Sequence, residues 1–194
     1  MISTIIFFLV MFAVSEMAVR WWRVSPEVSR TVEHVISGLV AAALPFWLVK
    51  NQIILLSGLF FAFLMVSKSI KLLRSLHNIK RFSYGEVLFP LGIGLAAINC
   101  LPLHEALYTA SVLILALADP TARLVGEHLS KSPSVIKSNS GSLAFFVVAL
   151  TIGWLWLGLS TGIVLALLST AAERVSPYGL DNVSITAVTW LMLI

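Results

Sequence analysis

The sequence predicts an all-α integral membrane protein, a single bundle of about seven to eight transmembrane helices that occupies the whole chain, residues 1–194. Composition gives the first reason: 59% of the residues are hydrophobic and 11% are charged, whereas soluble domains carry roughly 25% charged residues. The mean hydropathy of +0.98 points the same way. The third reason is a succession of long apolar runs with short polar connections and no linker that would separate a second domain.

Eight apolar runs divide the chain, at about residues 2–19, 31–49, 52–66, 85–100, 105–118, 142–158, 159–172 and 182–194. A helix needs roughly 20 residues to cross a bilayer, so the shorter runs must extend into their polar flanks or cross a thin bilayer. The first run lacks the basic start and the small-residue cleavage site of a signal peptide, and we interpret it as a span. The last run is the shortest and could insert only halfway.

If each run crosses once, the charged residues separate by side. One side receives 12 of the 13 basic and eight of the nine acidic residues, and the other receives only Lys50 and Glu105. Loops rich in Lys and Arg stay cytoplasmic, so we expect a multi-pass protein with its active site on the cytoplasmic side. The net charge of +4 favours anionic lipid headgroups or a polyphosphate as partners, and we expect no nucleic-acid partner.

Three polar segments on that side differ in character. Residues 67–82 carry hydrophobic residues at helical spacing and predict an amphipathic helix in the inner interface, with a plain basic loop as the alternative. Residues 119–141 are rich in Pro, Gly, Ser and Asn and predict irregular backbone. Pro177 and Gly179 predict a turn between the last two runs.

Asp119 ends the fifth apolar run and is followed by Pro120, which restricts a helix at that point. Asp119, Ala122 and Gly126 recur at spacings of three and four, so a helix would place them on one stripe. Small residues there would admit a ligand or another helix. Alternatively, Asp119 caps a helix that begins at Pro120.

The segment Lys137-Ser138-Asn139-Ser140-Gly141-Ser142 opens the sixth run. Backbone N–H groups at a helix N-terminus, together with one lysine, make a phosphate site. A simple helix cap is the alternative interpretation.

Glu173 ends the seventh run, and Asp181 and Asn182 begin the eighth. Carboxylates near a membrane are costly unless they are paired, solvated or bound to a metal. With Asp119 they could hold Mg²⁺, which prefers a few carboxylates plus phosphate oxygens. Solvation at the helix ends is the alternative.

Two further sets lie at the same predicted ends. Arg30 and His34 are four residues apart and share a helix face. Pro90 cannot donate a hydrogen bond to the carbonyl of Glu86, which leaves that carbonyl beside the Glu86 carboxylate. For His34 a buried structural role, and for Glu86 an ordinary kink with a solvated side chain, are the alternatives.

These motifs resemble the polyprenol kinase family of dolichol kinases, phytol kinases and CTP-dependent diacylglycerol kinases. Arg30-x-x-x-His34 is similar to the family's R-K-x-x-H, and Glu86 to Gly92, EVLFPLG, to its E-x-x-F-P-L-G. Asp119-x-x-Ala122-x-x-x-Gly126 followed by Lys137-Ser138-x-x-Gly141-Ser142 resembles its nucleotide-binding stretch, and Glu173…Asp181-Asn182 its late E…D-N. The chain departs from the pattern at Thr31, where the family has Lys, and at Ser140, where it has Glu.

The resemblance implies Mg²⁺-dependent transfer of the γ-phosphoryl group of CTP to the hydroxyl of a membrane lipid alcohol. In that case the metal ligands would be Asp119, Glu173 and Asp181, and the catalytic residues would be these three with Asn182 and His34. The nucleotide would be bound by Arg30, Glu86, Arg123, Gly126, Lys137, Ser138, Gly141 and Ser142. The alcohol tail would stay in lipid. The small residues Gly92, Gly94, Ala96 and Ala97 could leave it room or could serve close helix packing.

Three rival hypotheses remain open from the sequence. A phosphatidate cytidylyltransferase also uses CTP and Mg²⁺, but its K-D and H-G-G-x-D-R motifs are absent from the sequence. A small transporter would place its ionisable residues near the bilayer midplane and show repeated halves. An inactive lipid-binding member of the family is the third possibility, because Ser140 replaces a family glutamate.

Overall fold

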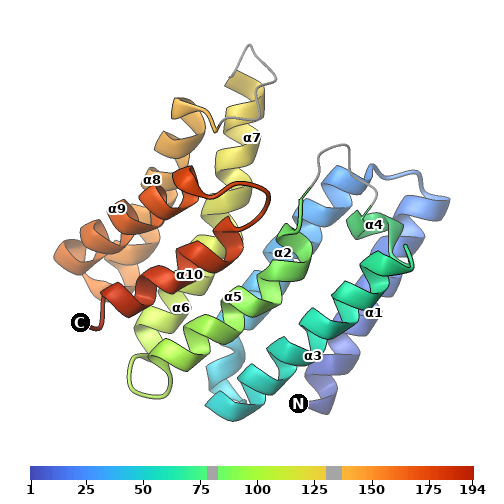
Figure 1. Cartoon of the computed structure of the whole chain (residues 1–194), viewed down its shortest axis with the longest axis horizontal. Helices are drawn as coiled ribbons and strands as arrows, with labels where there is room; N and C mark the ends of the chain where they lie inside the picture. The colour runs from blue at the N-terminus through green and yellow to red at the C-terminus, as the bar shows by residue number, and fades with distance from the viewer. Residues whose placement is uncertain (78–82, 130–136) are drawn as a thin grey trace.

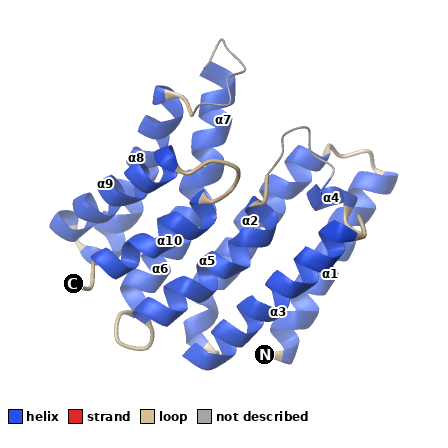
Figure 2. Ribbon diagram, viewed as in Figure 1, coloured by secondary structure: helices blue, strands red, loops and turns tan. Residues whose placement is uncertain are grey.

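The computed structural model describes residues 1–77, 83–129 and 137–194, and within these ranges the regular structure is entirely helical. Figure 2 shows helices joined by short loops. The helices are α1 (Ile2–Trp21), α2 (Pro26–Ala43), η1 (Leu44–Phe46), α3 (Lys50–Ser69), α4 (Arg74–His77), α5 (Gly85–Cys100), α6 (Glu105–Leu113), η2 (Ile114–Ala118), α7 (Asp119–Leu129), α8 (Asn139–Leu157), α9 (Leu159–Val175) and α10 (Asp181–Leu191). Each of the eight predicted apolar runs lies largely in a helix, as expected when the backbone must satisfy its own hydrogen bonds in lipid.

The bundle has a central helix, α5, with α3 packed on one side and α10 on the other. Helices α1 and α4 pack against α2, whereas α7, α8 and α9 form the opposite part of the molecule (Figure 1). Both termini lie away from the starts of α5 and α8. The fold therefore brings the starts of α2, α5, α8 and α10 and the end of α9 to one end of the bundle.

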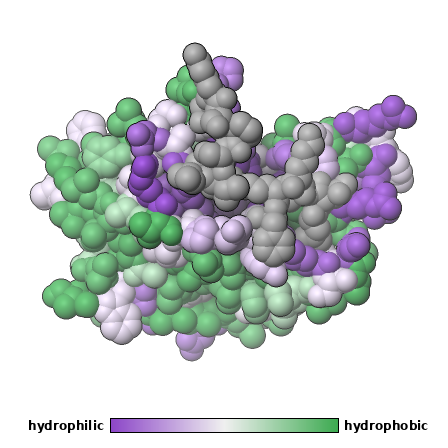
Figure 3. All heavy atoms as spheres, turned by 45° about the horizontal axis from the view of Figure 1, so that its top comes forward, coloured by the Kyte–Doolittle hydropathy of each residue, from purple (hydrophilic) through white to green (hydrophobic). Residues whose placement is uncertain are grey.

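Among the described residues, four helical segments are long and apolar enough to cross a membrane, by length and composition: Ile2–Trp21, Lys50–Ser69, Glu105–Leu129 and Asn139–Leu157. Large hydrophobic side chains such as Leu9, Trp154 and Leu155 are exposed on the outside of the bundle. Hydrophobic surface covers the body and polar surface gathers at the end shown uppermost in Figure 3. The chain is thus an all-α protein with membrane-spanning character, and the count of seven to eight spans stays a prediction.

Glycines bring helices into close contact. A methyl group on Gly153 would lie 2.8 Å from the Cα of Gly162, so α8 and α9 meet backbone to backbone. A Cβ on Gly92 would lie 2.0 Å from the carbonyl oxygen of Asn182, which fixes α5 against α10. Such contacts are typical of membrane helices, where small residues allow close packing.

The small residues of α5 serve helix packing. Besides Gly92, a Cβ on Gly94 would lie 3.1 Å from Ser57 on α3, and Ala96 and Ala97 are fully buried. These positions leave no room for a lipid tail, so the packing alternative is correct.

Two expectations about the polar segments are wrong. Residues 119–129 are not irregular: α6, η2 and α7 form one continuous helix from Glu105 to Leu129. Residues 130–136 of the predicted irregular segment lie outside the described residues. Residues 67–82 are not one interfacial helix. Residues 67–69 complete α3, and Lys71 at φ 54° breaks the helix because left-handed backbone cannot continue it.

The short helix α4 also differs from an interfacial helix in its environment. Leu73 and Leu76 are buried against Phe8, Phe12 and Leu64, so this segment packs on the bundle. The part of the predicted amphipathic helix at 78–82 lies outside the described residues.

Candidate active site

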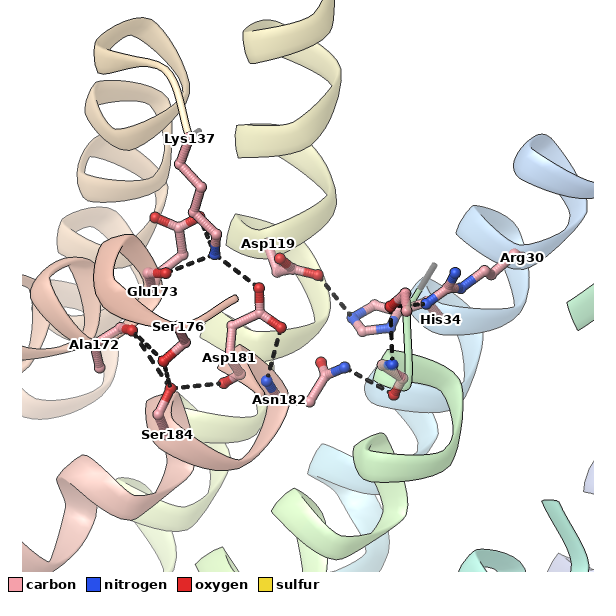
Figure 4. Close-up of polar contacts among 12 residues, drawn as sticks. Arg30, His34, Asp119, Lys137, Ala172, Glu173, Ser176, Asp181, Asn182 and Ser184 are labelled. Carbon is pink, nitrogen blue, oxygen red and sulfur yellow. Dashed lines mark hydrogen bonds and ion pairs between the residues drawn. The ribbon is translucent and has the colours of Figure 1, made fainter. Parts of the chain in front are cut away.

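Lys137 is the centre of the first ionic cluster. It lies just before α8, and its Nζ atom is 2.7 Å from Oε1 of Glu173 at the end of α9 and 2.7 Å from Oδ2 of Asp181 at the start of α10. Its ammonium also donates to the main-chain carbonyl of Glu173 at 2.6 Å. Figure 4 shows Lys137 reaching between the two carboxylates. One cation thus joins three elements that are distant in the sequence.

Lys137 is held in its protonated, positively charged form. Burial by itself would lower the pKa of this lysine, but Asp181 and Glu173 outweigh burial and raise the pKa above its usual value. The Coulomb attraction between these partly buried charges is stronger than the attraction between fully solvated charges at the same distance. Lys137 therefore stays protonated throughout the physiological range and can neutralise an anion.

Asp119 lies beside this cluster but on the continuous helix 105–129, at the junction of η2 and α7. Its carboxylate acts electrostatically on both Glu173 and Asp181. On its other side, its Oδ2 atom is 3.9 Å from Nε2 of His34. Asp119 therefore neither ends nor caps a helix, and it faces a partner on each side.

The π-helical turn η2 explains how His34 is held. In the π pattern a residue donates to the carbonyl five residues back, and Pro120 has no N–H to give to Leu115. Nε2 of His34 lies 3.0 Å from that carbonyl oxygen. Because a carbonyl only accepts, Nε2 carries the hydrogen, and this bond orients the imidazole of His34 next to Asp119.

The start of α8 forms the cationic side of the site. Ser138 is the N-cap, and its hydroxyl accepts a hydrogen bond from the N–H of Gly141 at 3.0 Å. Arg174 from α9 donates to the hydroxyl of Ser142 at 3.0 Å and to the side-chain oxygen of Asn139 at 2.6 Å. A helix N-terminus flanked by Lys137 and Arg174 has the charge and the donors to hold phosphate oxygens.

The predicted small-residue stripe on α7 accommodates another helix. A Cβ on Gly126 would lie 2.8 Å from the hydroxyl oxygen of Ser138, and a Cβ on Gly141 would lie 2.7 Å from the carbonyl oxygen of Ala122. The stripe therefore packs α7 against the start of α8. Gly126 and Gly141 shape the site by bringing these helices together.

A second ionic cluster surrounds Glu86 at the start of α5. Its side chain is 2% exposed, with Oε1 2.6 Å from Nζ of Lys68 and Oε2 3.1 Å from a guanidinium nitrogen of Arg30. Lys68 also donates to the carbonyl of Ser83 at 2.5 Å, and Arg30 donates to the hydroxyl of Ser83 at 3.2 Å. Glu86 is thus a buried anion held between two cations and is not a solvated residue at a kink.

Asn182 ties the two clusters together. Its side-chain amide donates to the carbonyl of Gly85 at 2.8 Å, and its own N–H donates to Asp181 at 3.0 Å. Asn182 is 3% exposed. It therefore holds Asp181 against the start of α5, beside the Glu86 cluster, and is a positioning residue of the site.

Arg123 from α7 reaches across to α2. Its guanidinium donates a hydrogen bond to the hydroxyl of Thr31, which in turn donates to the carbonyl of Glu27 at 2.7 Å. Thr31 is the position where the family motif carries a lysine. The structure places a cation from another helix at that position.

The donor set has a partial fit to Mg²⁺. Asp119, Glu173 and Asp181 supply the hard oxygen ligands that Mg²⁺ prefers, and Oε2 of Glu173 is buried with no hydrogen-bond partner. Within residues 1–77, 83–129 and 137–194, however, no three His, Cys, Asp or Glu side chains are arranged to hold a metal by themselves. Lys137 occupies the position between two of the acids, so phosphate oxygens would have to complete the coordination of an ion.

The structure thus brings the predicted residues into two adjoining clusters, one around Lys137 and one around Glu86. It also adds two residues that sequence reasoning missed as site residues, Lys68 and Arg174. Both belong to the charged side, and each follows an apolar run by a few residues. Many basic residues on the charged side follow an apolar run in this way, so the position alone does not mark Lys68 and Arg174 as site residues. Only their contacts with Glu86 and Ser142 do so.

The described residues thus form an all-helical apolar bundle with carboxylates and cations gathered at one end. A search of protein-family models finds no match, and a search of solved structures finds none either. Among curated proteins, the chain is similar to a phytol kinase from Synechocystis, with 28% identity over 175 residues that cover 82% of this chain and 75% of the relative. This similarity supports membership of the polyprenol and phytol kinase family, which the sequence motifs resemble.

Proposed function

We propose that the protein is a lipid alcohol kinase that transfers the γ-phosphoryl group of CTP to the hydroxyl of a membrane lipid alcohol, with Mg²⁺, at the cytoplasmic face. Its relationship to a phytol kinase supports a lipid alcohol kinase. The observation that carries the mechanism is the convergence of Lys137 with Glu173 and Asp181 at 2.7 Å, beside Asp119. Phosphoryl transfer depends on charge neutralisation and alignment more than on covalent chemistry.

The cationic and the anionic residues of the site would have different roles. Lys137, Arg174 and the N-terminus of α8 would bind the phosphate chain, whose negative charge they match. Asp119 and Glu173 would hold Mg²⁺, which when bound withdraws charge from the phosphate oxygens. Lys137 would then exchange part of its contact with Asp181 and Glu173 for contact with phosphate.

His34 and Arg30 stand on the acceptor side. His34 lies 3.9 Å from Asp119, so a hydroxyl near this pair would be close to a carboxylate able to take its proton. Arg30 is held by Glu86 at 3.1 Å and would orient the acceptor or its new phosphate. This arrangement favours in-line attack by an alcohol that enters from the side of α2.

Product analysis tests the proposal. The purified protein is incubated with Mg²⁺, a lipid alcohol and CTP labelled at either the α- or the γ-phosphate. We expect γ-label in the lipid and release of CDP. Transfer of α-label with release of pyrophosphate would indicate a cytidylyltransferase, and no transfer to any alcohol would overturn the proposal. Parallel reactions with ATP test the preference for cytosine.

A further inference from the structure

A pocket opens beside the second ionic cluster, between α1, α2, α3 and α5. Arg30, Glu33, His34 and Glu86 line it at the charged end of the bundle. Farther along the same helices the lining becomes apolar.

The apolar part is built from aromatic and aliphatic side chains of opposite helices. Phe8 and Phe12 of α1 meet Phe60 of α3 with ring centroids 5.0 and 6.1 Å apart, and Ala41 and Ile93 line the pocket from α2 and α5. A space with several charged groups at one end and hydrocarbon along the rest matches an amphiphile with a small polar head. A nucleotide, which is polar throughout, does not match it.

Glu33 gives the second and independent observation. It lines the pocket, is 2% exposed, and neither oxygen of its carboxylate has a hydrogen-bond partner. The hydroxyl groups of Ser15 and Ser75 lie near the same carboxyl group, but neither is hydrogen-bonded to it. The hydroxyl of Ser75 is itself buried without a hydrogen-bond partner. A buried acceptor without a donor is costly, so a ligand that brings a donor would be stabilised here.

We propose that this pocket is the acceptor site: it holds one apolar chain of an alcohol, and Glu33 accepts the hydrogen bond of the alcohol's hydroxyl. This inference rests on the proposed kinase function, because it identifies the occupant as the substrate. The location suits transfer, since His34 both lines the pocket and lies 3.9 Å from Asp119. The hydroxyl would therefore lie on the α2 side of the phosphate site, where Glu33 would orient it as a positioning residue.

Photolabelling without nucleotide tests the pocket separately from the kinase reaction. The full chain in detergent is incubated with a single-chain isoprenoid alcohol that carries a diazirine in its tail, irradiated and mapped by mass spectrometry. We expect labels on the peptides that contain Phe8, Phe12 and Phe60, displaced by an excess of the unlabelled alcohol. Labels spread evenly over lipid-facing residues such as Trp154 would overturn the inference.

Two pairs of variants sharpen the test. Glu33→Gln should raise the half-saturating concentration of the probe about five- to tenfold, because an amide replaces the carboxyl group that accepts the hydrogen bond of the hydroxyl, while the exposed Glu27→Gln should not change it. Ala41→Phe should fill the apolar part and abolish labelling, while Leu39→Phe, exposed on the same helix, should not. If Ala41→Phe does not fold, the comparison of Glu33→Gln with Glu27→Gln tests the inference by itself.

The outcomes separate the two proposals. A protein that phosphorylates alcohols with wild-type KM in both Glu33→Gln and Ala41→Phe would overturn the pocket assignment and leave the kinase function standing. A protein that is labelled in the pocket but transfers no phosphate to any alcohol would overturn the kinase function, and with it the identification of the occupant as a substrate.

Discussion

The Nζ atom of Lys137 lies 2.7 Å from the Oδ2 atom of Asp181, although 44 residues separate the two in the sequence. The contact joins the segment before α8 to the start of α10. Lys137 is bonded to Glu173 as well, so it offsets two partly buried carboxylates. Under the proposed function, the same ammonium would bind the phosphates of the nucleotide.

Replacement of this lysine should mainly weaken nucleotide binding. Lys137→Ala removes a charge-assisted contact to phosphate, so we expect the Kd for CTP to rise about 10- to 100-fold. Equilibrium binding of CTP by the purified variant measures this. Lys71→Ala, at an exposed site on the same side, is the matched control, and equal Kd values for the two variants would remove Lys137 from the nucleotide site.

Asp119→Asn should abolish phosphoryl transfer and leave the bundle folded. The amide keeps the volume of the side chain but loses the negative charge that acts on the site, and loss of such a group costs about 100-fold or more in rate. The transfer rate and the thermal midpoint are measured together. The control is Glu105→Gln, an exposed acid at the far end of the same continuous helix. Wild-type turnover in Asp119→Asn would contradict the assignment.

The Glu86 cluster should contribute to stability. Lys68→Met removes the cation 2.6 Å from a carboxylate that is 2% exposed and leaves Arg30 as its charged partner. We expect a loss of about 1–3 kcal/mol in the free energy of unfolding, seen as a lower thermal midpoint in detergent. Lys71→Met, on exposed backbone three residues later, should have little effect. Equal midpoints for the two variants would show that the ion pair contributes nothing net.

Close packing of α5 on α10 should be essential to the site. Gly92→Ala places a methyl group 2.0 Å from the carbonyl oxygen of Asn182, so the helices must separate at a cost of about 1–3 kcal/mol. Because Asn182 positions Asp181, we also expect transfer to fall. Gly58→Ala is the control, since its methyl meets nothing within 4 Å and Ala favours a helix. A Gly92→Ala protein as stable and active as Gly58→Ala would show that this contact is dispensable.

The helices were predictable from the sequence because apolar runs in lipid have few alternatives to helix. The segment after Asp119 was not, because Asp-Pro and a polar composition ordinarily mark a helix boundary. The π turn before Pro120 keeps the helix continuous and leaves the Leu115 carbonyl to His34. A local pattern does not reveal that choice, which depends on α2 packing beside it.

The acids, Lys137 and the Arg30–His34 pair could be grouped from the sequence, since all fall near the predicted ends of apolar runs on one predicted side. Their division into two clusters was not, because it depends on which helices neighbour one another. Lys68 and Arg174 escaped notice for the same reason. Their partners are Glu86, 18 residues away, and Ser142, 32 residues away, and no spacing rule connects such pairs.

The most direct test of the central claim follows the γ-phosphate of CTP. Wild-type protein, Asp119→Asn and Glu105→Gln are incubated with Mg²⁺, γ-labelled CTP and a single-chain lipid alcohol, and label in the extracted lipid is counted. We predict labelled lipid phosphate from the wild type and Glu105→Gln and almost none from Asp119→Asn. Absence of labelled lipid from every protein, or equal label from all three, would contradict the account.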